Sequence, residues 1–343
     1  MRAISKTSAG PGITLTEVPE PTIRPGCVKL RVHSGSVCGT DLHIYNWDAF
    51  SKSRIHPPRI IGHEFCGEII EVGEGVSQGR MGEFVSSESH IICGHCPRCL
   101  AGEGHICLNT RILGIDVDGG FADYAVIPSE NARPVPKGLS SDIAAMLDAL
   151  GNGVHTVCAG PVEGQTVLIT GLGPIGLFAV AICKAMGAKQ VIATEIKARR
   201  KEIARGLGVD VLIDPTEEDA SAKIAAIAPG GVDVTLEMSG HPSAIKLATD
   251  HTRPGGRVSL LGLYPDETEP VPMNTLVMKG LQVQGIVGRR LWETWDTMKW
   301  LIEEKGLDVS PVVTDRVNYA DAEHGFEILK AGTAGKVVID FLK

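Results

Sequence analysis

Long hydrophobic runs are absent from this sequence of 343 residues. One of the longest, IGLFAVAIC at residues 175–183, falls well short of the roughly 20 apolar residues that a membrane-spanning helix needs. The N-terminus, MRAISKTSAGPGITL, lacks the apolar stretch of about 7–15 residues that marks a secretory signal peptide. We therefore expect no membrane association and a cytoplasmic location.

Basic residues are fewer than acidic residues in this sequence. The chain has 33 Lys and Arg against 41 Asp and Glu, which gives a formal net charge of −8. Because nucleic acid is bound by a basic face, this balance argues against a nucleic-acid partner. Internal repeats, low-complexity tracts and long linkers are also missing. The length and the ordinary composition, with 43% hydrophobic residues, indicate a globular protein of two domains.

Nine cysteines are present, an odd number, and four of them stand close together in CGHCPRCLAGEGHIC at residues 93–107. The spacing C-x2-C-x2-C-x7-C suits a tetrahedral zinc ion with four thiolate ligands and no open position. The competing interpretation is an iron–sulfur cluster, but the bacterial ferredoxin pattern has a shorter last gap followed by proline. We therefore predict a structural zinc site, with the other thiols free in a reducing compartment. Its ligands would be Cys93, Cys96, Cys99 and Cys107.

The pattern of secondary structure changes along the chain. The first part has short strand-like segments separated by Pro and Gly, at residues 28–35, 60–73 and 82–89. From about residue 166, apolar strands alternate with helical spacing, which predicts a parallel sheet covered on both faces. The strands are expected at residues 166–171, 190–195, 210–214, 232–240, 256–263 and 281–288, and helices at 174–187 and 198–208. The tail, GKVVIDFLK, has the pattern of a last strand.

A dinucleotide-binding fingerprint follows the first of these later strands. GLGPIG places Gly171, Gly173 and Gly176 in the G-x-G-x-x-G pattern at the start of a predicted helix. The first glycine would form a tight turn, the second would admit a pyrophosphate, and the third would let the helix pack on the strand. Glu195 ends the next strand, where a carboxylate binds ribose hydroxyls and repels a 2′-phosphate. This predicts NAD; the alternative is a glycine-rich turn in an unrelated α/β fold.

A second metal site, open for chemistry, is predicted around two separate segments. Cys38 supplies one soft ligand and His63 a second, while a third could be a carboxylate, either Glu64 or Asp148. Three protein ligands leave room for water or an alcohol on zinc. Taken singly, each residue also has an ordinary structural interpretation, and the choice between the two carboxylates stays open.

Together these features resemble the zinc-dependent medium-chain alcohol dehydrogenases over nearly the whole chain. The zinc signature of that superfamily, GHE-x2-G-x5-G-x2-V, is met by residues 62–76. Further segments are most similar to the members of the family that act on L-threonine. These are CGTDLHIYNWD (38–48), ESHIICGHCPRC (88–99), LNT (108–110), GNGVHT (151–156), GRRLWETW (288–295) and GKVVID (335–340).

The resemblance implies an α/β protein with a GroES-like, β-rich catalytic domain and a Rossmann domain, whose doubly wound parallel sheet binds the dinucleotide. The catalytic zinc domain would comprise residues 1–150 together with 293–343, and the NAD-binding domain residues 151–292. The resemblance also implies a homotetramer.

The same resemblance assigns residues to the metal and the proton path. Cys38, His63 and Glu64 would bind the catalytic zinc, with the acid of Asp148 beside it, at a position where the family usually has the longer Glu. Thr40 and His43 would relay a proton to solvent. Contacts with the cofactor are implied for Ile175, Glu195, Arg200, Leu261, Gly262, Leu263, Ile286 and Val287, of which Glu195 replaces the usual Asp.

The implied activity is the NAD-dependent oxidation of the 3-hydroxyl of L-threonine to 2-amino-3-oxobutanoate, with two zinc ions per chain. The alternative is a zinc-dependent dehydrogenase of another secondary alcohol, diol, polyol or amino alcohol, because it would share every motif. A non-enzymatic binding protein is opposed by the complete ligand set, and a zinc-ribbon binder of nucleic acid by the acidic charge. Side chains that could border the substrate are Tyr45, Trp47, His90, Arg289 and Arg290.

Overall fold

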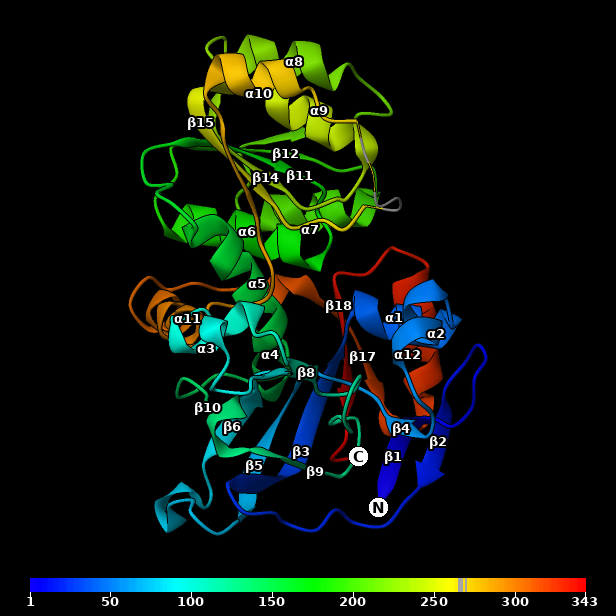
Figure 1. The fold of residues 1–343 in the computed structure, drawn as a ribbon. Helices are drawn as coiled ribbons and strands as arrows, with labels where there is room; N and C mark the ends of the chain where they lie inside the picture. The colour runs from blue at the N-terminus through cyan, green and yellow to red at the C-terminus, as the bar shows by residue number, and fades with distance from the viewer. Residues whose placement is uncertain (265–267, 269) are drawn as a thin grey trace. The chain divides into compact units, whose positions relative to one another are not determined.

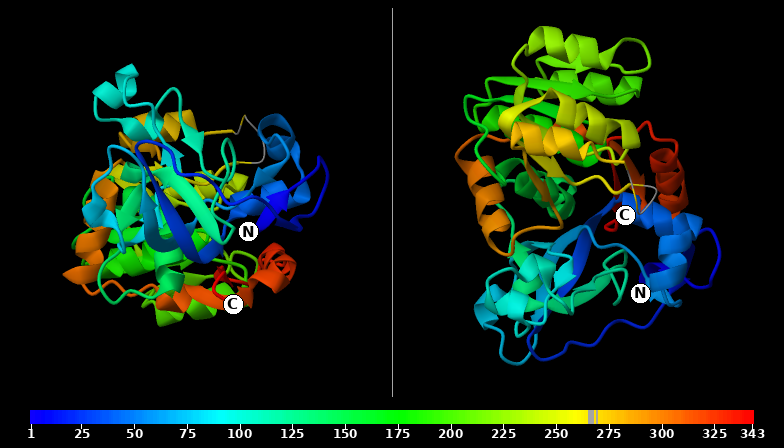
Figure 2. Two further views of the ribbon diagram at one scale, coloured as in Figure 1. Left: turned by 90° about the horizontal axis from the view of Figure 1, so that it is seen from below. Right: turned by 45° about the horizontal axis from the view of Figure 1, so that its top comes forward.

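Two compact units make up the computed structural model, which describes residues 1–264, 268 and 270–343. The first unit joins Met1–Ala149 to Val313–Lys343, and the second is Leu150–Val312. Both ends of the chain lie in the first unit (Figures 1 and 2), where the Arg2 guanidinium donates to the Lys343 carbonyl at 3.1 Å. The first unit is therefore closed by the last residues of the chain.

The second boundary differs from the one that the sequence predicts. The C-terminal part of the first unit begins at Val313, whereas the predicted domain begins at residue 293. The difference arises because helix α11 (Glu293–Glu303) belongs to the second unit, where its Thr294 lies near Gly151. The sequence pattern changes back to short, mixed elements near residue 293, about one helix before the chain re-enters the first unit at Val313.

The first unit is built around one long strand, β3 (Cys27–Val37). Its main sheet has seven strands in the order β10-β6-β5-β3-β18-β17, with β9 also paired to β3. Strand β3 pairs antiparallel with β5, β9 and β18, so it holds together segments that are far apart in the chain. Two smaller sheets have the orders β2-β1-β4 and β7-β8.

The other strands of this unit are β1 (Arg2–Lys6), β2 (Thr14–Glu17), β4 (Arg59–Ile60), β5 (Phe65–Val72), β6 (Phe84–Ser87), β7 (His90–Ile91), β8 (Arg111–Ile112), β9 (Tyr124–Pro128), β10 (Ala132–Pro134), β17 (Val313–Asn318) and β18 (Lys336–Asp340). Its helices are α1 (Gly39–Asn46), α2 (Ala49–Arg54), α3 (Pro97–Leu100), α4 (Ser141–Ala145) and α12 (Ala322–Lys330), and α5 (Leu147–Cys158) runs on into the second unit.

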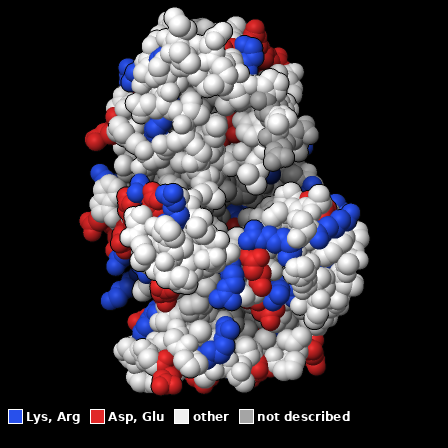
Figure 3. Space-filling view, viewed as in Figure 1, with Lys and Arg blue, Asp and Glu red and all other residues white. Residues whose placement is uncertain are grey.

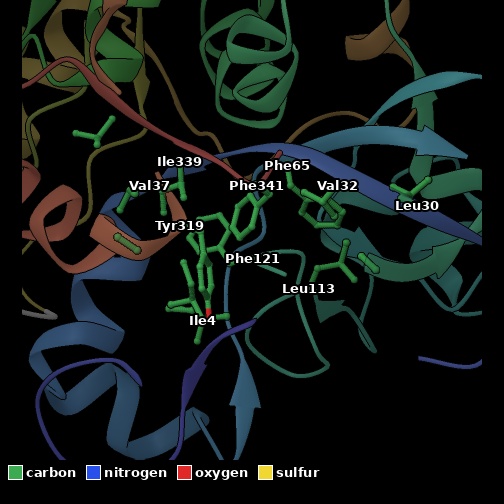
Figure 4. Packing of buried hydrophobic residues seen from close by; sticks show 14 of the residues in the cluster. Ile4, Leu30, Val32, Val37, Phe65, Leu113, Phe121, Tyr319, Ile339 and Phe341 are labelled. Carbon is green, nitrogen blue, oxygen red and sulfur yellow. The ribbon is translucent and has the colours of Figure 1, made fainter. Parts of the chain in front are cut away.

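Aliphatic and aromatic side chains pack together in the core of the first unit (Figure 4). The rings of Phe121 and Phe341 lie 6.1 Å apart between centroids, and both side chains are buried. Phe121 also presses on Gly62, where a Cβ atom would lie 2.1 Å from the ring and φ is +89°. Only glycine fits there. Because Gly62 directly precedes His63 and Glu64, this packing fixes the backbone from which both side chains start.

The second unit is a six-stranded sheet, parallel throughout, in the order β13-β12-β11-β14-β15-β16. Helices α6 and α7 cover one face, and α8, α9 and α10 cover the other (Figure 1). The chain runs outward from β11 to β13 and then returns to the other side of β11. Strand order therefore reverses between β11 and β14, as in a doubly wound dinucleotide-binding sheet.

The strands of this unit are β11 (Thr166–Thr170), β12 (Gln190–Thr194), β13 (Val211–Ile213), β14 (Val232–Glu237), β15 (Thr252–Leu260) and β16 (Gln282–Gly285). The helices besides α11 are α6 (Pro174–Ala185), α7 (Ala198–Gly206), α8 (Ala220–Ile227), α9 (Pro242–His251) and α10 (Met273–Lys279). Among the described residues, no helix is long and apolar enough to cross a membrane.

A buried tyrosine joins helix α1 to helix α12 in the first unit. Tyr45 is 7% exposed and donates a hydrogen bond to the Glu327 carboxylate at 2.6 Å. This bond, together with burial, raises the pKa of Tyr45 far above its ordinary value. Its ring lies 5.3 Å from that of Phe326. Tyr45 therefore links α1 to α12. These contacts give the side chain a structural role that does not require contact with a substrate.

We expect Tyr45→Phe to lower the free energy of unfolding by about 1–3 kcal/mol, because a hydrogen bond to a charged acceptor is lost. Urea denaturation measures the loss. Tyr124→Phe is the matched control, since the structure gives the Tyr124 hydroxyl no hydrogen bond among the described residues and its ring contacts Lys29 instead. Equal losses of unfolding free energy in the two variants would contradict a stabilising role for the hydrogen bond between Tyr45 and Glu327.

Candidate metal centres and dinucleotide site

Four cysteine side chains lie together in the segment between β7 and β8. The Sγ atoms of Cys93, Cys96, Cys99 and Cys107 are all within 4.8 Å of one another. The separations are 3.5 Å for Cys96–Cys99, 3.9 Å for Cys96–Cys107 and 3.6 Å for Cys93–Cys107. Disulfide sulfurs would be about 2.05 Å apart, whereas tetrahedral Zn–S bonds of about 2.3 Å place sulfurs about 3.8 Å apart. The cluster has the dimensions of a closed zinc site.

Hydrogen-bond donors surround the sulfurs of this cluster. Cys93 Sγ accepts from the Cys96 N–H at 3.3 Å and from the Asn109 amide at 3.5 Å, and Cys107 Sγ accepts from the Asn109 N–H at 3.3 Å. The Asn109 amide, helped by backbone N–H groups, lowers the pKa of the Cys93 thiol to about 5. Burial and neighbouring thiols raise the pKa of Cys99 to about 12. Hydrogen-bond donors of this kind stabilise thiolates that lie close to one another. Such a group of thiolates suits a cation bound between the sulfurs.

The second cluster consists of Cys38, His63 and Glu64, the three residues for which the resemblance implies a catalytic metal. One ligand atom from each lies within 4.8 Å of the others. His63 and Glu64 are buried, and Cys38 is partly exposed at the start of α1. Within the described part of the chain, these two clusters are the only groups of this kind. Three ligands would leave a tetrahedral metal ion with one position for water or an alcohol.

Asp41 lies behind this trio and was not predicted from the sequence. Its carboxylate is fully buried, accepts the Cys38 N–H at 2.9 Å, and lies 3.6 Å from His63 Nδ1. Carboxylates of this kind fix the orientation of a metal-binding histidine. Burial alone would lower the pKa of His63, but the anions of Asp41 and Cys38 raise it well above its ordinary value. A field that retains a proton here would also favour a metal cation.

Lys336 reaches the same trio from β18, at the far end of the sequence. Its Nζ lies 2.5 Å from Glu64 Oε2, and the two side chains are 2% and 1% exposed. Burial alone would lower the pKa of Lys336, but Glu64 and Cys38 outweigh burial and raise it, so the ammonium keeps its charge. The sequence motif GKVVID predicted only the strand, because nothing in the local pattern shows that the lysine points inward.

Asp148 does not belong to the trio. It is buried, and its two carboxylate oxygens accept from the Ser89 N–H at 2.8 Å and from the Ser89 hydroxyl at 3.3 Å. Of the two carboxylates that the sequence left open, Glu64 is the one that lies with Cys38 and His63. The geometry therefore favours Glu64 as the third ligand, and a role for Asp148 beside the metal stays a prediction.

Thr40 and His43 stand about one turn apart on α1, which puts them on the same side of the helix. Thr40 Oγ1 is 4.0 Å from Cys38 Sγ, and the His43 side chain is 55% exposed with Nδ1 bonded to Asp48. Burial alone would raise the pKa of Asp48, but the hydrogen bonds from His43 and Ser51 hold it below its ordinary value. Asp48 therefore accepts the Nδ1 proton, which leaves Nε2 free to exchange protons with water.

The three glycines of the fingerprint have the three different environments that the pattern predicts. Gly171 has φ +84°, and a Cβ there would lie 2.7 Å from Ser239 Cβ. A Cβ on Gly176 would lie 2.1 Å from the Gly171 carbonyl oxygen, whereas one on Gly173 meets nothing within 4 Å. The first glycine makes the turn and the third packs the helix. The second leaves open the space where a pyrophosphate would approach the N-terminus of α6.

Residues with predicted cofactor contacts gather at one edge of the second sheet. Carboxyl ends of parallel strands meet at the same edge, and the contacts follow four of the six strands. The glycine turn with Ile175 follows β11, Glu195 follows β12, Leu261, Gly262 and Leu263 follow β15, and Ile286 and Val287 follow β16, while Arg200 lies on α7. Leu263 and Val287 are exposed, with exposed fractions of 93% and 51%, so their side chains are accessible to a ligand.

Glu195 also organises the glycine turn. Its carboxylate accepts the N–H groups of Leu172 at 2.9 Å, Ile196 at 2.8 Å and Lys197 at 2.9 Å. A carboxylate has about four lone-pair sites, so an acceptor site is left for a ribose hydroxyl. Glu237, at the end of β14, holds the neighbouring loop through the Ser239 N–H at 2.8 Å, and the sequence did not single it out. Both acids tie loops to strand ends at the predicted cofactor edge.

Two family models match separate parts of the chain. Residues 24–137 match the alcohol dehydrogenase GroES-like domain, and residues 174–304 match the zinc-binding dehydrogenase domain. An L-threonine 3-dehydrogenase of Pyrococcus horikoshii is 46% identical over 340 residues, which cover 98% of each chain. This chain belongs to the zinc-binding dehydrogenases. The family resemblance and the predicted fold class, GroES-like plus Rossmann, are thereby confirmed.

Solved structures of the same fold cover almost all of the chain. An alcohol dehydrogenase of Escherichia coli CFT073, complexed with NADH, matches with a TM-score of 0.91 at 28% identity over 99% of both chains. A 2R,3R-butanediol dehydrogenase of Bacillus subtilis matches with a TM-score of 0.90 at 28% identity, again over 99% of both chains. The zinc-binding dehydrogenase family and the NADH complex support zinc as the ion for the clusters and a nicotinamide cofactor for the glycine turn.

The contrast between Gly176 and Gly173 gives a matched pair of variants. We expect Gly176→Ala to lower the free energy of unfolding by about 1–3 kcal/mol, because the methyl group would overlap the Gly171 carbonyl. Gly173→Ala meets no protein atom within 4 Å and should leave stability unchanged within about 0.5 kcal/mol. It should instead weaken binding of NAD, because the methyl group takes up the pyrophosphate space. Urea denaturation and calorimetric titration with NAD separate these effects; a reversed pattern would refute the assignment.

Proposed function

We propose that this protein is a zinc- and NAD-dependent dehydrogenase that oxidises the 3-hydroxyl of L-threonine to 2-amino-3-oxobutanoate. The observation that carries the proposal is the 46% identity, over 98% of both chains, with an L-threonine 3-dehydrogenase. The open geometry of the trio supports it, because an alcohol needs a coordination position that the four-cysteine cluster cannot offer. The oxidation would be a step in threonine catabolism towards glycine.

Cys38, His63 and Glu64 would hold the catalytic zinc, and the four-cysteine cluster a second, structural zinc. A catalytic zinc supplies Lewis acidity, which lowers the pKa of a hydroxyl group enough for a proton to leave near neutral pH. Asp41 orients the His63 ring through the contact at Nδ1. The closed cluster, in contrast, keeps the segment between β7 and β8 folded.

Thr40 and His43 would carry the proton of the substrate hydroxyl to water. The Thr40 hydroxyl can accept one proton while it donates its own. His43 then takes the proton on Nε2, and its exposed ring can release it directly to solvent. Asp48 stabilises the positive charge that His43 carries between these two events, through the hydrogen bond at Nδ1.

NAD is the cofactor that the dinucleotide edge would select. Glu195 places a negative charge where NADP carries its 2′-phosphate, and the N-terminus of α6 faces the space beside Gly173. The nicotinamide ring supplies the hydride acceptor. The residues that follow β15 and β16 would shape its surroundings. We also propose a homotetramer in the cytoplasm, as the family resemblance and the cysteine usage predict.

The alternative function is oxidation of a diol, and the match to the butanediol dehydrogenase structure supports it. Its sequence identity of 28% is well below the 46% of the threonine enzyme, so we place threonine first. A nucleic-acid binder has no support from the face in Figure 3, where Lys and Arg are mixed with Asp and Glu and form no single basic surface.

A substrate panel tests the proposed function. We expect reduction of NAD with L-threonine to exceed that with 2,3-butanediol, sorbitol or L-serine by at least about tenfold in kcat/KM, which corresponds to about 1.4 kcal/mol. The measurement is the ultraviolet absorbance of the reduced cofactor, with NADP run beside NAD. L-allo-threonine is the matched control because it differs only in configuration at the reacting carbon. Activity on butanediol with none on L-threonine would contradict the proposal.

Two cysteine variants test the division of labour between the metal clusters. Cys38→Ser should abolish turnover and remove one zinc per chain while the protein stays folded. Cys96→Ser should chiefly destabilise the fold, because a structural zinc contributes on the order of 10 kcal/mol to folding. Zinc counts by atomic absorption and thermal unfolding distinguish them. A stable, fully active Cys96→Ser protein would contradict the structural role.

A further inference from the structure

The pairing of Lys336 with Glu64 has no part in the proton path or in cofactor binding. The ammonium lies 2.5 Å from Glu64 Oε2, in a place that excludes water from both side chains. Lys6, another deeply buried lysine of this unit, is paired differently: its ammonium binds the carbonyl oxygens of Gly10 and Gly12. Lys336 instead contacts a carboxylate of the metal trio. What it does to that carboxylate is therefore a question about the metal site.

The backbone keeps both partners in place. Strand β18 pairs antiparallel with β3, with Val337 opposite Val37, so the same register sets Lys336 level with Cys38. The carbonyl of Glu64 accepts the Ser36 N–H of β3 at 2.9 Å. Lys336 and Glu64 are thus anchored to the same short segment, residues 36–38, at the end of β3 and directly after it. Their separation is set by sheet pairing and not by the attraction between the two side chains alone.

The carboxylate has two possible partners at this position. Its ligand atom lies within 4.8 Å of those of Cys38 and His63, close enough to bind the same ion, while Oε2 is held by Lys336. Without the lysine, both oxygens would be free to turn towards a metal cation. A carboxylate bound through both oxygens would take up the position that a substrate hydroxyl needs, whereas a carboxylate bound through one oxygen leaves that position open.

We propose that Lys336 holds one oxygen of the Glu64 carboxylate away from the metal, so that Glu64 binds through its other oxygen alone and one coordination position stays open for an exchangeable ligand. Lys336 is then a positioning residue, acting only through Glu64. The inference rests on the proposed metal site, but it concerns the metal alone and does not depend on which alcohol is the substrate. It also accounts for a fully buried charge that would otherwise cost stability.

Lys336→Met tests the proposal because it removes the charge and keeps a side chain of similar length. With Co²⁺ in place of zinc, the wild-type protein should change its visible spectrum when imidazole is added, since imidazole can enter an open position. Lys336→Met should lose most of that response, because Glu64 fills the position. It should also release the ion to a chelator more slowly, by a factor on the order of ten, since a nearby positive charge is gone.

Four further variants make the result decisive. Lys6→Met removes a comparably buried lysine away from the trio and should leave both readouts unchanged. Lys336→Gln, which keeps a hydrogen-bond donor, should shift the readouts in the same direction and replaces the Met variant if that one fails to fold. Lys336→Met combined with Glu64→Gln should regain the imidazole response, because a neutral amide is a weaker metal ligand. Cys38→Ser identifies which phase of metal release comes from the trio.

An imidazole response and a release rate in Lys336→Met within about twofold of wild type would overturn the proposal, as would faster release. A double variant that stays closed to imidazole would overturn it too, because Glu64 would then not be the group that fills the position. None of these measurements uses threonine or NAD. A protein that fails the substrate panel and still shows these metal responses would refute the substrate and leave the role of Lys336 intact.

Discussion

The pairing of β3 with its neighbours is the constraint on which the metal trio depends. Cys38 follows directly from the end of β3, and the backbone of Glu64 is tied to Ser36 within that strand. Lys336 arrives on the other side through β18, the last strand of the chain. Because β3 is hydrogen-bonded on both sides, side chains from three distant parts of the sequence meet in fixed positions. The site is a property of the completed sheet and of no single segment.

Two glycines next to the metal trio, Gly62 and Gly35, allow the ring of Phe121 to pack closely against the backbone. Phe121 occupies the space that any side chain at Gly62 would need, and Gly35 of β3 faces the same ring at 2.6 Å from where its Cβ would be. Close packing of this kind transmits small displacements, since protein interiors contain few voids. The glycine of the zinc signature is therefore required by the core, while its two neighbours, His63 and Glu64, are available for chemistry. In this motif, Gly62 is needed for packing, and the two residues that follow it are placed to bind a metal.

Local patterns could be predicted from the sequence, and long-range neighbours could not. The four-cysteine cluster, the glycine turn and most strands of the second unit follow from spacing within a few residues, and the structure places them as expected. Asp41, Asp48 and Lys336 were missed because their importance depends on what lies opposite them. Asp41 stands one helical turn after Cys38, which is a signal that could have been used. No such signal exists for Lys336, which is 272 residues away from Glu64.

The predicted domain boundary near residue 293 shows the same limit. The periodicity of apolar residues predicts whether a segment forms a helix or a strand. It does not predict the unit to which the segment belongs, and α11 is an ordinary amphipathic helix that could belong to either unit. In the folded chain it lies in the second unit, with Thr294 of its first turn near Gly151 of α5, which is far away in the sequence. A contact between residues so far apart in the sequence produces no periodic pattern from which it could be predicted. Assignment of the helix therefore needs the folded arrangement, even where the surrounding strands and helices are predicted correctly.

The carboxylates with predicted functional roles in the two units share one physical feature: each has oxygens already engaged by a fixed donor. Glu64 is held by Lys336, Asp148 by Ser89, and Glu195 by the Leu172 N–H. A carboxylate that is anchored in this way cannot swing freely, yet it keeps lone pairs for a ligand. The cost of ordering the side chain is met on folding and not when a ligand binds, which is the advantage of a preorganised site. The anchoring donors differ in charge, and that difference matters. A neutral N–H or hydroxyl fixes direction alone, whereas the ammonium of Lys336 also competes with a metal cation for the same oxygen.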